Sequence, residues 1–204
     1  QITDSIKTMT KYAKMITDPR SIRKEMEKAW FLMLNASPGP VWIDIPGDVA
    51  STVVETDELD AFDEQAYIDE NWASYYQENP SYRKEDTEYL LKKVAEAKHP
   101  VILAGTAIRH ANQQGTFIQA VEKLGIPVVT AWDAHDIIWD SHPMYCGRPG
   151  SVGNRAGNFI IQNADLLIVV GCRLNIRMIG FNFGEFAKNA YKMAIDIDEA
   201  ELHK

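Results

Sequence analysis

The sequence has few cysteines, no long apolar run and no excess of positive charge. Its two cysteines, Cys146 and Cys172, form no C-x-x-C pair, so we expect reduced thiols in a cytoplasmic protein. No apolar stretch reaches the roughly 20 residues that cross a bilayer, and no signal peptide opens the chain. The formal net charge of -8 disfavours a nucleic-acid partner, because an acidic chain repels phosphates. We therefore expect neither a membrane nor a nucleic acid as a partner.

Several motifs of cofactor binding and catalysis are also absent. Gly105 stands alone after its predicted strand, so no G-x-G-x-x-G dinucleotide fingerprint is present, and G-x-x-x-x-G-K-[ST] is missing too. These absences disfavour a nicotinamide dehydrogenase and a P-loop NTPase. His135 and His142 lack metal-ligand spacing, and no Ser/His/Asp or Cys/His arrangement emerges. We therefore predict no catalytic residue and no metal ligand in this chain.

The first part of the sequence reads as a helix followed by a strand. The periodicity predicts a helix over 21–34 and a strand over 41–45, ended by Pro46-Gly47-Asp48. The apolar residues at helical spacing are Ile22, Met26, Ala29, Trp30, Met33 and Leu34. Because the chain opens on Gln1, without an initiating Met and close to a helical pattern, we expect a truncated or processed start and not a natural beginning.

The middle of the chain is polar and shows little periodicity. Residues 50–83 carry many Asp, Glu, Tyr, Ser and Asn, and a structureless stretch of this length is unusual inside one compact domain. We therefore predict a linker over 50–83. It separates residues 1–49, a truncated piece of another α/β domain, from a second domain over 84–204.

From residue 84 onward, helices and strands alternate. The predicted helices cover 87–98, 111–124, 153–163 and 183–189, and the predicted strands cover 100–105, 127–130, 165–171 and 191–196. These strands are apolar on both faces, which is typical of a parallel sheet covered on both sides. The sequence therefore predicts an α/β fold with a doubly wound parallel sheet and helices on both faces.

Ligands of such a sheet bind beyond the carboxyl ends of the strands, where suggestive residues stand. The glycine-rich segment 147–155 runs into a helix and suits a phosphate or diphosphate, although a merely connecting turn is an equal alternative. The arginines would clamp phosphate oxygens or form surface ion pairs, and the aspartates would accept ribose hydroxyls or cap a helix. The candidate cofactor-binding residues are Gly105, Thr106, Gly147, Gly150, Gly153, Arg173, Arg177, Asp196 and Asp198.

Five segments of the sequence form a pattern in a fixed order. They read PGPVWIDIPGDV at 38–49, HPVILAG at 99–105, LGIPVVT at 124–130, DLLIVVGCR at 165–173 and IDIDEAE at 195–201. Together they resemble the acetolactate synthase (acetohydroxyacid synthase) large-subunit family of thiamine-diphosphate enzymes. Each piece is weak alone, but all five occur in the family's order and cover nearly the whole chain. The resemblance identifies 1–49 as the end of a pyrimidine-binding domain and 84–204 as the central, FAD/NAD-binding-like domain.

The resemblance implies a three-domain parent enzyme that uses thiamine diphosphate and magnesium. Such an enzyme decarboxylates a 2-oxo acid such as pyruvate and joins the product to a second carbonyl compound, as in branched-chain amino-acid biosynthesis. The glutamate that activates the cofactor lies earlier in the family, and the G-D-G…N motif lies later. We therefore expect this segment to be non-catalytic by itself, with the parent's other domains as partners and a homo-oligomeric parent.

The resemblance also raises the question of FAD, which the central domain of acetolactate synthases binds. The family's glycine loop falls on Gly147, Gly150 and Gly153, and its G-x-R-F-D-D-R-x-x-G falls on 171–180. Leu174, Asn175 and Ile176 replace F-D-D, and Thr106-Ala107 replace glycines, so FAD binding stays open. The alternatives to an acetolactate synthase are another thiamine-diphosphate decarboxylase or carboligase, a free-standing module that binds FAD, NAD or a CoA ester, and a structural spacer.

Overall fold

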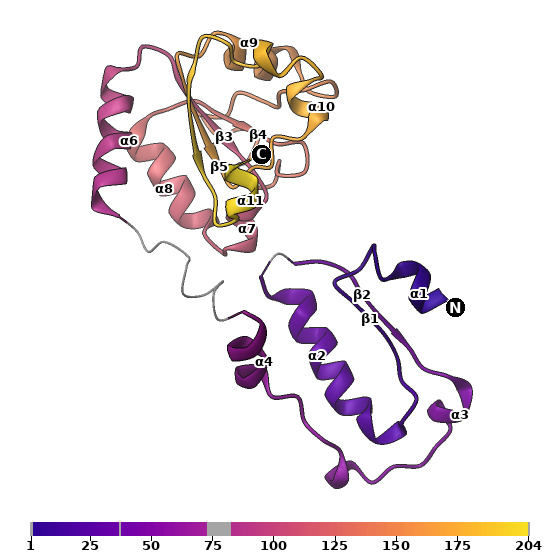
Figure 1. The fold of residues 1–204 in the computed structure, drawn as a ribbon. Helices are drawn as coiled ribbons and strands as arrows, with labels where there is room; N and C mark the ends of the chain where they lie inside the picture. Colours follow the sequence, from indigo (N-terminus) through magenta and orange to yellow (C-terminus); the bar gives the residue numbers. More distant parts are fainter. Residues whose placement is uncertain (1, 37, 73–82, 204) are drawn as a thin grey trace. The chain divides into compact units, whose positions relative to one another are not determined.

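The computed structural model describes residues 2–36, 38–72 and 83–203. The chain divides into two compact units, residues 1–79 and residues 80–204, which are described separately. The first unit is indigo to purple in Figure 1, and the second runs from magenta to yellow.

The first unit contains two parallel strands joined across a long helix. Its elements are α1 (Ile2–Ile6), β1 (Tyr12–Met15), a 3-10 turn (Pro19–Ser21), α2 (Ile22–Leu34) and β2 (Val41–Asp44). Tyr12 pairs with Val41, and Met15 pairs with Asp44. Parallel strands need a crossover connection, and α2 supplies it by packing along the two strands (Figure 1). The prediction of a helix and a strand here is confirmed, but β1 was missed.

Only part of the apolar pattern of α2 is buried. Ala29 is buried, together with Phe31 and Leu32, which lie outside that pattern. Trp30 is 65% exposed, and Met26 and Leu34 are also exposed, although they belong to the pattern. An amphipathic pattern shows that a helix has an apolar side, but partners from other segments decide which residues are covered.

Those partners come from the segment that was predicted as a linker. After the end of α3 (Gly47–Ala50), it contains a 3-10 turn (Thr56–Glu58) and α4 (Glu64–Asn71), whose first turn is capped by the Asp63 carboxylate. The Phe31 ring centroid lies 5.6 Å from that of Phe62, 6.1 Å from Tyr67 and 5.2 Å from Trp72. Residues 62–72 are therefore held against α2 by an aromatic cluster, and the rest of the predicted linker up to residue 82 lies outside the described residues.

The second unit is the predicted parallel α/β fold. Its sheet has the order β4-β3-β5-β6, and all neighbouring strands are parallel. The elements of this unit are α6 (Lys84–Glu96), β3 (Pro100–Ala104), α7 (Ala107–His110), α8 (Gln114–Leu124), β4 (Val128–Thr130), α9 (Arg155–Gln162), β5 (Leu166–Val170), α10 (Ile176–Ile179), a 3-10 turn (Phe183–Glu185), β6 (Tyr191–Ile195) and α11 (Glu199–Leu202).

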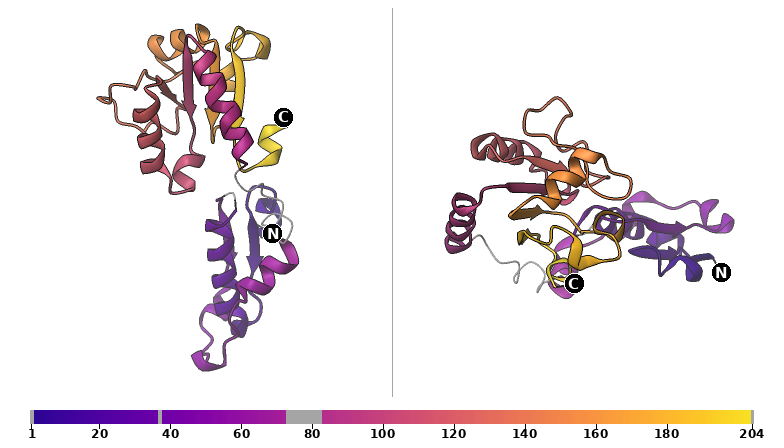
Figure 2. Two further views of the ribbon diagram at one scale, coloured as in Figure 1. Left: turned by 90° about the vertical axis from the view of Figure 1, so that its left-hand side faces the viewer. Right: turned by 90° about the horizontal axis from the view of Figure 1, so that it is seen from above.

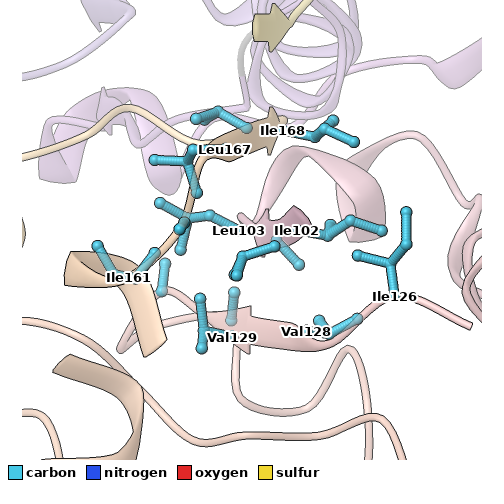
Figure 3. Close-up of a cluster of buried hydrophobic side chains, with 14 of the residues drawn as sticks. Ile102, Leu103, Ile126, Val128, Val129, Ile161, Leu167 and Ile168 are labelled. Carbon is cyan, nitrogen blue, oxygen red and sulfur yellow. The ribbon is translucent and has the colours of Figure 1, made fainter. Parts of the chain in front are cut away.

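Helices cover both faces of this sheet, as predicted. The step from β3 to β4 runs in one direction along the sheet and the step from β4 to β5 runs back, so right-handed crossovers place α8 and α9 on opposite faces. Figures 1 and 2 show α6 and α8 on one side of the sheet and α9 on the other. In Figure 3, Ile161 of α9 lies on the same side as Leu103, whereas Ile102 points to the side of Ile126.

The strand register places apolar side chains of neighbouring strands beside one another, so that they form rows across the sheet. Ile102 pairs with Val128 on one side and with Ile168 on the other, and all three are buried. Apolar rows on both faces at exposures of 0–4% place the core on each side of the sheet (Figure 3). This is the feature that the doubly apolar strands of the sequence predicted.

One predicted helix of this unit is wrong. Residues 183–189 form only a single 3-10 turn, because Ala187 adopts a positive φ of 45° that an α-helix does not allow. The predicted helix over 111–124 begins later, at Gln114, and α7 forms a separate short helix before it. Gly125 ends α8 in the left-handed conformation (φ 63°).

The aromatic cluster can be tested by truncating its central ring. We expect Phe31→Ala to lower the free energy of unfolding of the first unit by about 3–5 kcal/mol, because a large buried side chain is removed. The matched control is Trp30→Ala, the exposed neighbour, which should change it by less than about 0.5 kcal/mol. Urea denaturation followed by circular dichroism measures both, and equal losses would contradict the described face of α2.

Candidate functional site

The carboxyl ends of β3 and β5 mark the point where the strand order reverses. From β3 the chain moves to β4 on one side, and it then crosses back to β5 on the other. The turns that leave neighbouring strands at such a switch point diverge, which leaves room for a ligand between them. The turns after β3, β4 and β5 meet here.

These three turns line a hollow of about 240 Å³, which we call the strand-end hollow. Three of its residues follow β5, two follow β3 and two follow β4. The lining residues are Gly105, Thr106, Ala131, Asp133, Cys172, Arg173 and Asn175. Gly105, Thr106 and Arg173 are the predicted site residues that the structure brings together in this hollow.

The turn after β3 lies directly against the turn after β5. Gly105 donates its backbone N–H to the Val170 carbonyl at 2.9 Å, and Ala107 donates to the Gly171 carbonyl at 3.1 Å. A Cβ added to Gly105 would lie 2.1 Å from the Gly171 oxygen and 2.4 Å from the Cys172 Cα. Only glycine fits at this position, because the neighbouring atoms belong to the backbone and cannot move aside.

Arg173 forms an ion pair as well as lining the strand-end hollow. Its Nε lies 3.0 Å from Oε1 of Glu201, which belongs to α11 after the last strand. The arginine is largely exposed, so the pair adds little stability by itself. It joins the end of β5 to the segment after β6. The ion-pair alternative considered for Arg173 in the sequence is thus present in the structure.

The turn after β4 is fastened to the helices that follow β3. The Arg109 guanidinium pairs with the Asp136 carboxylate and also donates to the Asp133 carbonyl at 3.3 Å. The Gln114 amide donates to the carbonyls of Asp136 and Ile137 at 2.6 and 3.0 Å. The hydrogen bond from Arg109 holds the pKa of Asp136 below its usual range. These contacts fix the wall of the strand-end hollow that carries Asp133.

A second hollow of about 510 Å³ lies beside α9 and α10, and we call it the α9–α10 hollow. Two predicted site residues, Gly150 and Arg177, line it, together with mainly apolar side chains. The other lining residues are Ser151, Asn158, Ile161, Gln162, Ile176, Met178, Ile179, Gly180, Phe181 and Phe186. The predicted arginines therefore line different hollows.

The remaining predicted site residues line neither hollow. Gly147 and Gly153 lie within the glycine-rich turn before α9, and Asp196 and Asp198 follow β6. The Asp196 carboxylate accepts the backbone N–H of Asp198 at 3.0 Å. The role of these residues in cofactor binding stays a prediction.

Sequence reasoning did not select several residues of this region. Cys172 and Asn175 line the strand-end hollow. Their position directly after the long predicted strand could have marked them as candidate site residues. Thr130, at the end of β4, is fully buried and its hydroxyl has no hydrogen-bond partner. Leu174 adopts a positive φ of 49°, which a branched side chain rarely does, and no sequence signal marked it.

The histidines and cysteines have environments without metal-site geometry. His142 is buried, with Nδ1 accepting the Met144 N–H at 3.1 Å and Nε2 lying 3.4 Å from the Glu122 carboxylate. Burial raises the pKa of the Cys146 thiol. Across residues 2–36, 38–72 and 83–203, no three His, Cys, Asp or Glu side chains are grouped to hold a metal ion. In the same residues, no helix is long and apolar enough to cross a membrane.

The strand order and the hollow at its switch point define the second unit as a doubly wound α/β domain. A comparison with protein families gives the family. The model of the family "Thiamine pyrophosphate enzyme, central domain" matches residues 87–204. The chain therefore belongs to the thiamine pyrophosphate enzymes, and the family predicted from the five segments is confirmed.

Curated relatives extend the match to the first unit. The chain is 33% identical over 196 residues to the acetolactate synthase large subunit of Lactococcus lactis and 32% identical over 196 residues to the isozyme 1 large subunit of Escherichia coli. It is 32% identical over 202 residues to the acetolactate synthase large subunit of Corynebacterium glutamicum. Each match covers 96% of this chain, and the chain spans about a third of the length of these relatives.

The contact between the two turns predicts opposite effects for two glycines. We expect Gly105→Ala to lower the free energy of unfolding by about 1–3 kcal/mol, because its Cβ would overlap backbone atoms. Gly115→Ala, in α8 with no atom near its Cβ, should raise it by about 0.5–1 kcal/mol, since alanine favours a helix. Thermal denaturation distinguishes the two, and a neutral Gly105→Ala would refute the contact.

The Arg109–Asp136 pair predicts a pH dependence. The folded pKa of Asp136 lies below its ordinary value of 3.8. The ionised carboxylate therefore stabilises the fold at pH values above 3.8, and this contribution disappears as the pH falls through the folded pKa. Both side chains are about half exposed, so we expect a difference below about 1 kcal/mol between the protein and Asp136→Asn at pH 7. Urea denaturation should find that difference absent in strong acid, and an unchanged difference would contradict the pairing.

Proposed function

We propose that the parent of this chain is an acetolactate-synthase-like enzyme. It would decarboxylate a 2-oxo acid such as pyruvate and join the resulting carbanion equivalent to a second carbonyl compound, in a branched-chain amino-acid pathway. The observation that carries this proposal is the alignment with three acetolactate synthase large subunits, which runs through both units of the chain. A match confined to the central domain would support the cofactor class but not this reaction.

The proposal includes a domain assignment. Residues 1–49 would end a pyrimidine-binding domain, 50–83 would be the linker, and 84–204 would be the central domain. The match of the central-domain family to residues 87–204 supports the last boundary. The parallel strands β1 and β2, with exposed apolar side chains such as Trp30 on α2, are what one side of a larger α/β domain would present.

The parent's chemistry would rest on thiamine diphosphate and a divalent metal such as magnesium. Thiamine diphosphate supplies the stabilised carbanion on which decarboxylation and carboligation depend. The described residues do not fit the metal–diphosphate anchor, since they hold no group of three potential ligands. We therefore assign cofactor binding and catalysis to the parent's other domains. We propose that the parent is a homo-oligomer, and we expect this chain alone to be inactive.

The proposed role of the central domain itself is to bind a ligand in the strand-end hollow. Its walls come from three separate turns, and its polar and charged lining residues include Thr106, Asp133, Arg173 and Asn175. We propose that any ligand of this domain binds there, beside Gly105 and Arg173. The position at the switch point of the sheet supports this assignment.

Assays of the complete parent enzyme test the proposed function. With pyruvate, thiamine diphosphate and magnesium, the parent should release carbon dioxide and form acetolactate, whereas the 204-residue chain should form none. Release of carbon dioxide without a carbon–carbon bond would favour another thiamine-diphosphate decarboxylase. A parent that turns over no 2-oxo acid would contradict the proposal.

A further inference from the structure

We infer that this central domain does not hold the diphosphate of FAD, because the protein's own backbone and amide side chains close the two turns that would receive it. The inference rests on the proposed function, since the acetolactate synthase resemblance is what implies a flavin. A diphosphate on a doubly wound sheet needs open glycine turns and free N–H groups at a helix N-terminus. Both turns lack that opening.

The first closed turn follows β3. Gly105 is packed against Gly171 and Cys172 so tightly that a Cβ would overlap them, so no phosphate fits between the two turns. The N–H groups of Gly105 and Ala107 donate to the carbonyls of Val170 and Gly171. The helix that follows, α7, has only four residues, and its dipole is therefore small.

The second closed turn is the glycine-rich turn, residues 147–153, which precedes α9. The Asn154 side-chain oxygen accepts the N–H of Gly157 at 2.8 Å and that of Arg148 at 3.3 Å. It thereby occupies the helix N-terminus where an anion would bind. A Cβ on Gly147 would lie 2.3 Å from the same oxygen. The absence of a side chain at Gly147 makes room for Asn154 and not for a ligand.

Three further N–H groups of the glycine-rich turn are also engaged. Gly150 donates to the Asn158 side-chain oxygen at 2.8 Å, and Ser151 donates to the Arg177 carbonyl at 2.9 Å. Gly153 donates to the Gly150 carbonyl at 3.0 Å. A phosphate could reach these groups only by breaking hydrogen bonds that the fold already makes.

Close packing and backbone conformation account for Gly147, Gly150 and Gly153 without a bound cofactor. A Cβ on Gly153 would lie 2.2 Å from the Arg148 carbonyl oxygen, and one on Gly150 would lie 2.8 Å from that of Arg177. Gly147 and Gly150 also have φ values of 99° and 108°, which favour glycine. The family's glycine spacing is explained here by the close packing of the turn.

The strand-end hollow is small for a dinucleotide. Its volume of about 240 Å³ falls below the roughly 300–1,000 Å³ of pockets for drug-sized ligands, which are smaller than FAD. The carboxylates that the family pattern places before Arg177 are replaced by Asn175 and the apolar Ile176. Asp196, a candidate for the ribose, already accepts the N–H of Asp198.

A flavin titration of the parent enzyme and of the 204-residue chain tests the inference. After incubation with FAD and gel filtration, we expect no retained flavin absorbance and no shift of the melting temperature with FAD or with ADP. Stoichiometric flavin retained by either protein would overturn the inference. Acetolactate formation by the same flavin-free parent is measured in parallel, so a failure of the proposed function is seen independently of flavin binding.

Two variants of Asn154 test the closure itself. Asn154→Ala removes the acceptor of two N–H groups and should lower the melting temperature by about 2–4 °C. Asn154→Asp keeps an acceptor oxygen for both N–H groups and should leave the melting temperature within about 1 °C or raise it, because a carboxylate suits a helix N-terminus. Neither variant should acquire FAD binding. A neutral Asn154→Ala would contradict the closed turn.

Discussion

The close contact between the turn after β3 and the turn after β5 is the constraint on which the second unit depends. The two strands pair along their whole length, from Pro100 opposite Leu166 to Ala104 opposite Val170. The pairing continues into the turns through Gly105 and Ala107, so both chains leave the sheet together. The turns help to fix this register, because a shift by one residue would break both hydrogen bonds and bring a residue with a side chain to the position of Gly105, where a Cβ does not fit.

This contact also decides what the site can be. It places Gly105, Thr106, Cys172 and Arg173 around the strand-end hollow, but it fills the space in which a doubly wound domain usually receives a phosphate. The glycine-rich turn is closed in the same way by Asn154. A central domain of the thiamine pyrophosphate family thus keeps the glycine pattern for packing, while the proposed chemistry belongs to the parent's other domains.

The sequence predicted the elements that depend on local pattern. The strands over 100–105 and 165–171 were found because a doubly buried parallel strand is apolar throughout, and the motif resemblance gave the family. The short strand β1 and helices α7 and α10 were missed because four residues show too little periodicity. The buried face of α2 and the partner of Arg173 depend on Trp72 and Glu201, which are distant in sequence.

Amide hydrogen exchange at the two turns tests the central claim most directly. The N–H groups of Gly105 and Ala107 belong to the β3–β5 pairing, and that of Gly157 belongs to the closed turn before α9. We expect the Gly105 and Ala107 amides to exchange as slowly as those of the buried strands, and the rates of all three to be unchanged by FAD. Rapid exchange at Gly105 and Ala107, or protection of any of the three by FAD, would contradict the account.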